Sequence, residues 1–162
     1  MSTQTKLDLG DYLPYLVNRV GNILAEQFGA EALAPHRLSI AMWRVLAALA
    51  ARGSQRQIDL ADLTSIEAST LSRLVSRLIR MGLVTRNRSA NSNREVSVGL
   101  SGKGGALAAR LIPLARRCEA DAIAGQSRED LLVLKRCLRR VYGNLKSRTV
   151  AANGSRANRR AI

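Results

Sequence analysis

Apolar side chains recur over residues 67–81 with the period of an α-helix. Leu71, Leu74, Val75, Leu78 and Ile79 occupy positions i, i+3, i+4, i+7 and i+8. This spacing places them on one stripe that is wide enough to pack against a core. We therefore predict a helix that begins within two residues of Ile66 and ends at Gly82, which is suited to a left-handed C-cap. Thr64 and Glu67 have the spacing of a capping box at its start.

The opposite arc of this helix carries hydroxyl and guanidinium groups: Ser69, Ser72, Arg73, Ser76, Arg77 and Arg80. Short hydroxyls let a helix backbone approach a phosphate, and guanidinium groups pair with phosphates or with guanine edges. A merely solvated arc is the alternative, but solvated arcs usually mix charges of both signs. Because this arc has no acidic residue, the pattern favours DNA. Glu67 would oppose that contact if it faced the DNA.

The pattern changes to a period of two after Gly82. Val84, Arg86 and Arg88 alternate along one predicted strand, and the returning strand contains Val96, Val98 and Leu100. Residues 89–93 (SANSN) have turn chemistry. Since residues 57–63 form a shorter helix before the amphipathic one, the whole region has the outline of a winged helix-turn-helix. Three cations flank the hairpin tip and could follow a DNA backbone or enter a narrow minor groove: Arg86, Arg88 and Arg94.

Two helices are predicted before this region. Residues 11–28 place six apolar side chains on one face: Leu13, Leu16, Val17, Val20, Ile23 and Leu24. Pro14 is compatible with the first turn of this helix, where its missing N–H has no partner to lose. After a linker over residues 29–38, Ser39 caps a second helix that ends at Gly53. Its expected buried anchors are Trp43, Leu46 and Leu49.

Two further helices are predicted after the hairpin. Ser101 can cap a helix that reaches about Ala124, with a kink near Arg110 caused by Pro113. The last helix carries Glu129 and Asp130 in its first turn, where the helix dipole favours acidic groups. A heptad seam follows, made of Leu131, Leu134, Leu138, Val141 and Leu145. This seam covers either the core of one chain or a dimer interface. We expect residues 151–162 to form a basic flexible tail.

Composition supports a helical protein that binds a polyanion. A chain of 162 residues can bury one substantial core, and its 46% apolar but only 3% aromatic residues indicate aliphatic packing. The net charge is +14; residues 55–110 hold 9 Lys or Arg against 4 Asp or Glu, and residues 111–162 hold 12 against 4. Nucleic acid is favoured over a membrane because no apolar run spans about 18 residues. No secretory signal is visible, so we expect a cytoplasmic protein.

Three segments together carry a family resemblance. They are residues 60–86 (LADLTSIEASTLSRLVSRLIRMGLVTR), residues 38–49 (LSIAMWRVLAAL) and the motif of Leu100, Ser101 and Gly104 after the wing. In this combination they resemble the MarR family of bacterial transcription factors. Wings of that family usually carry an Asp two residues before the wing arginine, whereas this chain has Ser92 there and Ser89 at an earlier, commonly acidic site. The resemblance therefore implies a more positive wing whose Arg94 lacks a salt bridge.

The resemblance implies a mainly α fold with a β wing and a homodimeric regulator. Residues 11–38 and 101–150 would form dimerisation helices around a DNA-binding part at residues 39–100. Leu13, Leu16 and the seam would lie at the interface. Two-fold symmetry would place two recognition helices about one DNA turn apart on a pseudo-palindromic operator. The expected DNA-binding residues are Ser69, Thr70, Arg73, Ser76 and Arg77 on the helix, with Arg86, Arg88, Asn91 and Arg94 on the wing.

The resemblance also implies a small phenolic or other aromatic effector between the dimer helices and the winged part. The candidate residues are Tyr12, Tyr15, Arg19 and Trp43, for which core or interface packing is the alternative. The implied function is a sequence-specific, ligand-responsive repressor that binds double-stranded DNA. A winged-helix module that packages DNA without sequence preference, or that binds protein, is the alternative.

Other chemistry finds little support in the sequence. The single histidine, His36, falls in the predicted linker, and there is neither a glycine-rich phosphate loop nor a metal-ligand spacing. We therefore expect no catalytic residue, no metal and no cofactor. Cys118 and Cys137 are expected to pack on helices, with a redox switch as the alternative. Relatives that sense organic hydroperoxides use a cysteine in the first helix, where this chain has none.

Overall fold

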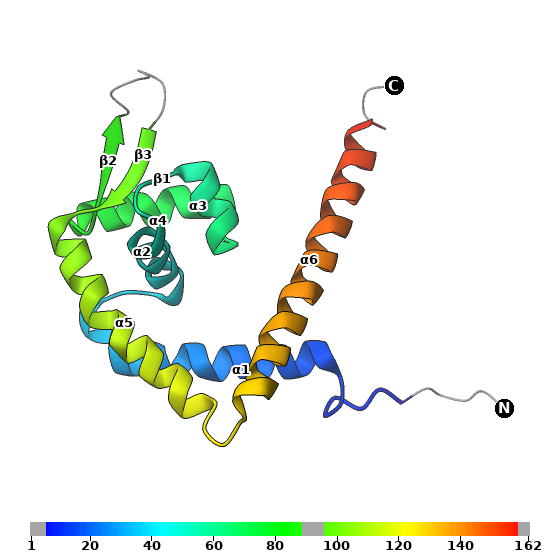
Figure 1. The fold of residues 1–162 in the computed structure, drawn as a ribbon. Helices are drawn as coiled ribbons and strands as arrows, with labels where there is room; N and C mark the ends of the chain where they lie inside the picture. The colour runs from blue at the N-terminus through cyan, green and yellow to red at the C-terminus, as the bar shows by residue number, and fades with distance from the viewer. Residues whose placement is uncertain (1–5, 89–95, 159–162) are drawn as a thin grey trace. The chain divides into compact units, whose positions relative to one another are not determined.

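A computed structural model describes residues 6–88 and 96–158, with side chains described as far as residue 148 and only the backbone of Arg88 and Val96 (Figure 1). The fold is mainly helical with a small antiparallel sheet, as predicted. The elements in these ranges are α1 (Leu13–Phe28), η1 (Gly29–Leu33), η2 (Ala34–His36), α2 (Ile40–Arg52), β1 (Gln55–Arg56), α3 (Gln57–Thr64), α4 (Ala68–Arg80), β2 (Val84–Arg88), β3 (Val96–Leu100), α5 (Gly102–Ala122) and α6 (Arg128–Asn158). The chain divides into two compact units, residues 1–122 and residues 123–162.

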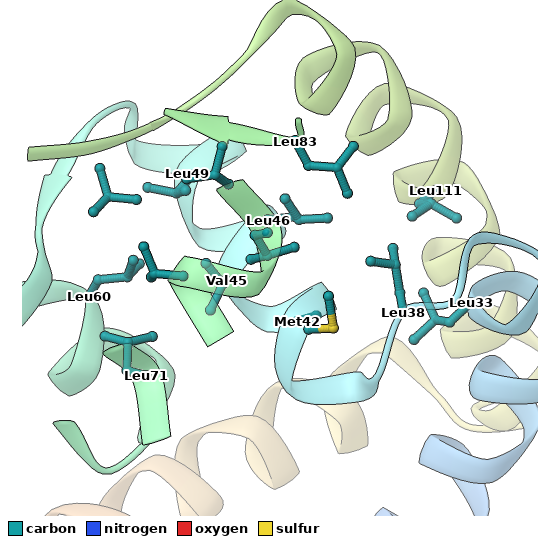
Figure 2. Packing of buried hydrophobic residues seen from close by; sticks show 14 of the residues in the cluster. Leu33, Leu38, Met42, Val45, Leu46, Leu49, Leu60, Leu71, Leu83 and Leu111 are labelled. Atoms are coloured by element: carbon teal, nitrogen blue, oxygen red, sulfur yellow. The ribbon is translucent and has the colours of Figure 1, made fainter. Parts of the chain in front are cut away.

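The core of the first unit is aliphatic and surrounds α2 (Figure 2). Met42, Val45, Leu46 and Leu49 on α2 are buried. Side chains from the other elements close the cluster: Leu33, Leu38, Leu60, Leu71, Leu83 and Leu111. Burial of so many branched side chains is the main favourable term for this unit. Leu46 and Leu49 are the buried anchors that the sequence predicted.

Trp43 is only partly buried, which corrects the prediction that it is a third buried anchor. Its ring lies on the edge of the core, 5.4 Å from the ring of Phe28 and inclined by 58°. Tilted aromatic pairs at this separation are favourable, because the positive edge of one ring faces the negative face of the other. Trp43 therefore links α2 to the end of α1.

The segment after α1 is helical, whereas the sequence predicted a linker over residues 29–38. It forms a π-helical turn, η1, and a 3-10 turn, η2, before Arg37 adopts a left-handed conformation with φ +55°. Ala32 and Leu33 are buried here. Because both side chains must reach the core, packing keeps the chain wound past Phe28. Pro14 lies in the first turn of α1, as predicted.

The sheet has the order β1-β3-β2 and contains one strand more than predicted. β2 and β3 form the wing hairpin, with Arg86 opposite Val98 and Asn87 opposite Ser97. β1 pairs with the other edge of β3, where Gln55 lies opposite Val98. Two polar residues, Gln55 and Arg56, have no strand pattern of their own. They become a strand because β3 offers an unpaired edge.

Serine side chains cap the helices that flank the winged part. The Ser39 Oγ accepts a hydrogen bond from Met42 N at 3.3 Å, and Ser101 Oγ accepts one from Gly104 N at 2.9 Å. Both caps were predicted. The helix after Ser101, α5, continues through Pro113 to Ala122.

The last helix, α6, is longer than predicted. It begins at Arg128 after the Ser127 cap and carries Glu129 and Asp130 in its first turn. It reaches Asn158, so the segment expected as a tail from residue 151 is largely helical. Three alanines and one arginine favour a helix over residues 151–158, although the segment also contains Gly154 and two asparagines. Within the described ranges, no helix combines the length and the apolar character needed to cross a membrane.

Candidate nucleic-acid interface

The recognition-helix candidate, α4, has two chemically opposite faces. Leu71, Val75 and Leu78 are fully buried against the core. The opposite arc is exposed at Ser69, Arg73, Ser76, Arg77 and Arg80, whereas Thr70 and Ser72 are half-buried. Five of the six residues that the sequence predicted on the outward arc are therefore exposed, and Ser72 is the exception. A helix that is anchored on one face and cationic on the other presents its polar side chains to solvent from a fixed base.

The arginines of this arc are not neutralised by carboxylates of the described residues. Arg73 Nη2 lies 3.4 Å from Thr70 Oγ1 on the same helix, a weak contact between two groups of the arc. Neither Arg73 nor Arg77 pairs with an acidic side chain in this part of the chain. Their positive charges are thus available to an external partner. Each guanidinium group has a planar set of donors that matches a phosphate or a guanine edge.

The N-terminus of α4 is already occupied by an acidic side chain. Glu67 is the N-cap: its Oε1 accepts from Ser69 N at 2.9 Å and its Oε2 accepts from Thr70 N at 3.0 Å. The Ser69 hydroxyl also donates to Glu67 Oε2. The hydrogen bond from that hydroxyl, followed by those from the two backbone N–H groups, lowers the pKa of Glu67 to about 2. An ionised carboxylate therefore occupies the N–H groups with which a helix N-terminus commonly binds a phosphate.

Thr64 does not take part in this cap, which corrects the predicted capping box. It is the last residue of α3, it is buried, and its Oγ1 donates to Leu60 O at 2.7 Å. The turn passes through Ser65, whose φ of +54° reverses the chain between α3 and α4. A buried hydroxyl must satisfy its donor within reach, and the carbonyl one helical turn earlier is the nearest acceptor.

An ion pair at the start of α3 was missed by the sequence analysis. Arg56 donates through Nε to Asp59 Oδ2 at 2.6 Å and through Nη2 to Asp59 Oδ1 at 3.0 Å. The hydrogen bond from Arg56 is the main reason that the pKa of Asp59 is lowered. The signal in the sequence is an Arg three residues before an Asp at a helix start. The pair joins the end of β1 to the first turn of α3.

The structure covers the wing arginines only in part. Arg86 is exposed on β2. Arg88 ends β2 opposite Val96, but its side chain lies outside the described residues. Asn91 and Arg94 also lie outside them, together with Ser89 and Ser92. Arg86 is thus the wing residue whose exposed position supports the predicted basic hairpin.

Two of the four effector candidates line one groove in the described part of the chain. Tyr15 and Arg19 line a shallow groove along α1, together with Asn18, Asn22, Ile23 and Glu26. Tyr12 is exposed outside that lining, and Trp43 packs on Phe28 instead. The structure thus brings together two of the four residues, both on α1.

A second hollow, of about 460 Å³, was not predicted. Its lining comes from the end of α1, from η1 and from α5: Phe28, Glu31, Ala32, Leu114, Arg117, Cys118 and Asp121. Cys118 is half-buried and Cys137 is exposed. Among the described residues, no three His, Cys, Asp or Glu side chains gather as metal ligands would.

Comparison with known proteins agrees with this geometry. The family model described as "MarR family" matches residues 38–96, from two residues before α2 to the first residue of β3. A MarR-family transcriptional regulator from Silicibacter pomeroyi is 30% identical, with a TM-score of 0.73 and coverage of 85% of this chain and 92% of that chain. The chain belongs to the MarR family. It is therefore a DNA-binding transcriptional regulator with a winged-helix fold.

Two other solved structures extend the comparison. A second MarR-family regulator from Silicibacter pomeroyi DSS has a TM-score of 0.77 and 29% identity, covering 89% of this chain and 97% of that chain. NadR in complex with 4-hydroxyphenylacetate has a TM-score of 0.72 and 26% identity, covering 87% of this chain and 97% of that chain. No curated protein sequence matches the chain. The agreement over nearly the whole length of these regulators includes the helices on both sides of the winged part.

Proposed function

We propose that this MarR-family regulator is a ligand-responsive repressor that acts in the cytoplasm and binds a pseudo-palindromic operator as a homodimer, without catalytic activity. The observation that carries the proposal is the exposed arc of α4, where Arg73 and Arg77 stand without acidic partners among the described residues. The major groove of DNA is wide enough to admit an α-helix such as α4. In this proposal the wing contacts the DNA beside that groove.

In this proposal Ser69, Thr70, Arg73, Ser76 and Arg77 contact the major groove. Arg73 and Arg77 are one helical turn apart and can each form two hydrogen bonds with a guanine edge. The wing residues Arg86, Arg88, Asn91 and Arg94 follow the sugar-phosphate backbone and the minor groove.

Exposed apolar side chains support the proposed homodimer. On α1, five of them are between 38% and 55% exposed: Leu13, Leu16, Val17, Val20 and Ile23. The α6 seam adds Leu134, Leu138, Val141 and Leu145, which are also exposed in the single chain, while Leu131 is half-buried. Apolar stripes of this length on two helices are costly in water and favour burial against a second copy.

We further propose that a small aromatic acid is the effector. The related regulator NadR was solved with 4-hydroxyphenylacetate. In this chain Arg19 can pair with a carboxylate and Tyr15 can contact a ring, since both line the groove on α1. Tyr12 and Trp43 lie outside that groove lining. In this proposal they contact the effector only if the second copy of the homodimer extends the groove.

The test is a titration of the full-length protein against DNA from upstream of its own gene, with random-sequence DNA as competitor. A repressor of this kind keeps its promoter fragment in an excess of competitor and loses it when a phenolic acid is added. Equal competition by random DNA would indicate a packaging module instead, and failure to bind any DNA would favour a protein-binding one. Arg19→Ala should abolish the effect of the acid while leaving DNA affinity unchanged.

A further inference from the structure

The C-terminal end of α4 is held by the first turn of α5. Three successive carbonyl oxygens after α4 accept hydrogen bonds from that turn. Lys103 Nζ donates to Met81 O at 3.2 Å, Ser101 Oγ donates to Gly82 O at 2.6 Å, and Ser101 N donates to Leu83 O at 3.1 Å. We call this set of contacts the carbonyl clamp. Carbonyls at a helix C-terminus lack partners in their own helix, so donors from outside satisfy them.

Gly104 allows the two segments to approach closely enough for the clamp. A Cβ placed on Gly104 would lie 1.9 Å from Leu83 O and 2.8 Å from Leu83 C. These neighbours are backbone atoms, which cannot rotate away as a side chain can. Gly104 is buried, and its N–H donates to Ser101 Oγ at 2.9 Å. The clamp therefore depends on a residue without a side chain at this position.

Ser101 differs from Ser39 and Ser127, which also cap helices in the described part of the chain. All three hydroxyls accept a hydrogen bond from their own helix, Ser39 from Met42 N and Ser127 from Asp130 N. The Ser127 hydroxyl donates back within its own turn, to Asp130 Oδ2 at 2.6 Å. The Ser101 hydroxyl instead donates across the fold to Gly82 O, 19 residues away in the sequence. Ser101 thus both caps α5 and ties it to α4.

The base of the clamp is anchored in the core. Four and seven residues beyond Gly104, Ala108 and Leu111 on α5 are each 1% exposed. The apolar stripe of α4 also packs on this core, but hydrophobic contact is non-directional and does not by itself fix the angle of a helix. Hydrogen bonds are directional, and three of them at one end of α4 restrict both tilt and rotation.

We propose that Ser101, Lys103 and Gly104 are positioning residues for DNA recognition, because they set the angle at which α4 presents Arg73 and Arg77. The inference rests on the proposed role of those arginines at the operator. Bidentate contacts with base edges require side chains held within about 0.5 Å and 10–20° of the bound geometry. Phosphate contacts tolerate much more. Loss of the clamp should therefore weaken operator binding more than binding to DNA of random sequence.

The experiment compares the full-length Ser101→Ala variant with two matched cap variants, Ser39→Ala and Ser127→Ala. Affinities for operator and for random DNA are measured by fluorescence anisotropy, and thermal unfolding is followed for each protein. Ser101→Ala should lose about tenfold in operator affinity, the size of one lost base contact, and much less on random DNA. Ser101→Thr should have the same affinities for operator and for random DNA as the unchanged protein, since threonine keeps the hydroxyl. The two control variants should keep the ratio of operator to random affinity.

The outcomes separate the clamp from the proposed function. If the unchanged protein does not prefer any operator, the proposed function fails. If it does, but all three alanine variants change the ratio alike, Ser101 only caps a helix and the clamp is refuted. Should Ser101→Ala fail to fold, Lys103→Met replaces it. Lys103 is exposed, and its contribution to the clamp is the hydrogen bond from its Nζ to Met81 O. An unchanged ratio for Lys103→Met would then overturn the proposal.

Discussion

The backbone N–H of Ser69 lies 2.9 Å from the Glu67 carboxylate, and the Ser69 hydroxyl donates to the same group. The recognition helix thus begins with a negative charge bound to its own first turn. A helix N-terminus attracts anions, so a phosphate would compete with Glu67 for these donors. In the proposed complex we therefore expect the affinity of α4 for DNA to depend more on its arginines than on its N-terminus.

Glu67→Gln should change both DNA affinity and the dependence of stability on pH. The amide carries no charge to repel a phosphate, so affinity should rise for operator and random DNA alike at pH 7. In the unchanged protein the pKa of Glu67 is lowered from 4.5 to about 2. Its stabilising contribution is therefore present above pH 4.5 and is lost as pH falls toward 2. The variant should lose less stability over that range.

The measurements for Glu67→Gln are anisotropy titrations and urea unfolding at pH 2.5, 4 and 7. The matched control is Glu26→Gln, an exposed carboxylate on α1. If the stability of both variants depends on pH in the same way, the Glu67 cap is not the source of the pH dependence. If DNA affinity does not rise, the carboxylate does not face the phosphates.

Arg73→Ala should weaken specific binding by about 1 to 3 kcal/mol and relax the preference for one base per half-site. The reason is the loss of two hydrogen bonds to one base edge. Selection of bound sequences from a randomised operator library measures this directly. Arg44→Ala removes an equal charge from the exposed side of α2 and should keep the base preference. A uniform loss across all sequences would make Arg73 a phosphate contact.

Arg86→Ala should weaken binding to all sequences alike and make it less sensitive to salt. A contact with one phosphate releases about one counterion, so the slope of log K against log salt should become shallower by about 1. Anisotropy titrations at several salt concentrations provide the slope. An unchanged slope would remove Arg86, and with it the described part of the wing, from the interface.

Gly104→Ala should destabilise the protein by about 1 to 3 kcal/mol, since its Cβ would overlap the Leu83 carbonyl. Gly105→Ala is the matched control, because nothing lies within 4 Å of a Cβ at that position. It should leave stability unchanged or raise it by under about 1 kcal/mol through helix propensity. Thermal unfolding of both variants measures the difference. Equal midpoints would show that α5 moves away from Leu83 at little cost.

Leu138→Lys in the α6 seam should dissociate the proposed dimer. A charged side chain cannot be buried at an apolar interface without a partner. Leu132→Lys is the control, since Leu132 is 61% exposed on the same helix but lies outside the seam. Light scattering after gel filtration gives the mass of each variant. A dimer that persists in Leu138→Lys would place the interface elsewhere.

The regular parts of the fold could be predicted because their residues act locally. Leu71, Val75 and Leu78 predicted α4 through their spacing, and Gly82 predicted its end. Ser39 and Ser101 predicted helix starts for the same reason. The winged-helix outline and the outward arc follow from these local signals together.

The remaining features depend on distant parts of the chain. Gln55 and Arg56 form a strand only because β3 offers an edge, and Thr64 turns away from the predicted cap because it is buried. The position of Trp43 beside Phe28 at the edge of the core follows from the packing of α2. Spacing in the sequence contains none of this information.

The backbone contact at Gly104 limits how this regulator can be redesigned. Anyone who alters the operator preference by exchanging residues on α4 has freedom along its outer arc, where Arg73, Ser76 and Arg77 are exposed. At Gly104, beyond the wing hairpin, a single hydrogen atom fills the space against the Leu83 carbonyl. A library that varies both places should return many solutions at the first and glycine alone at the second.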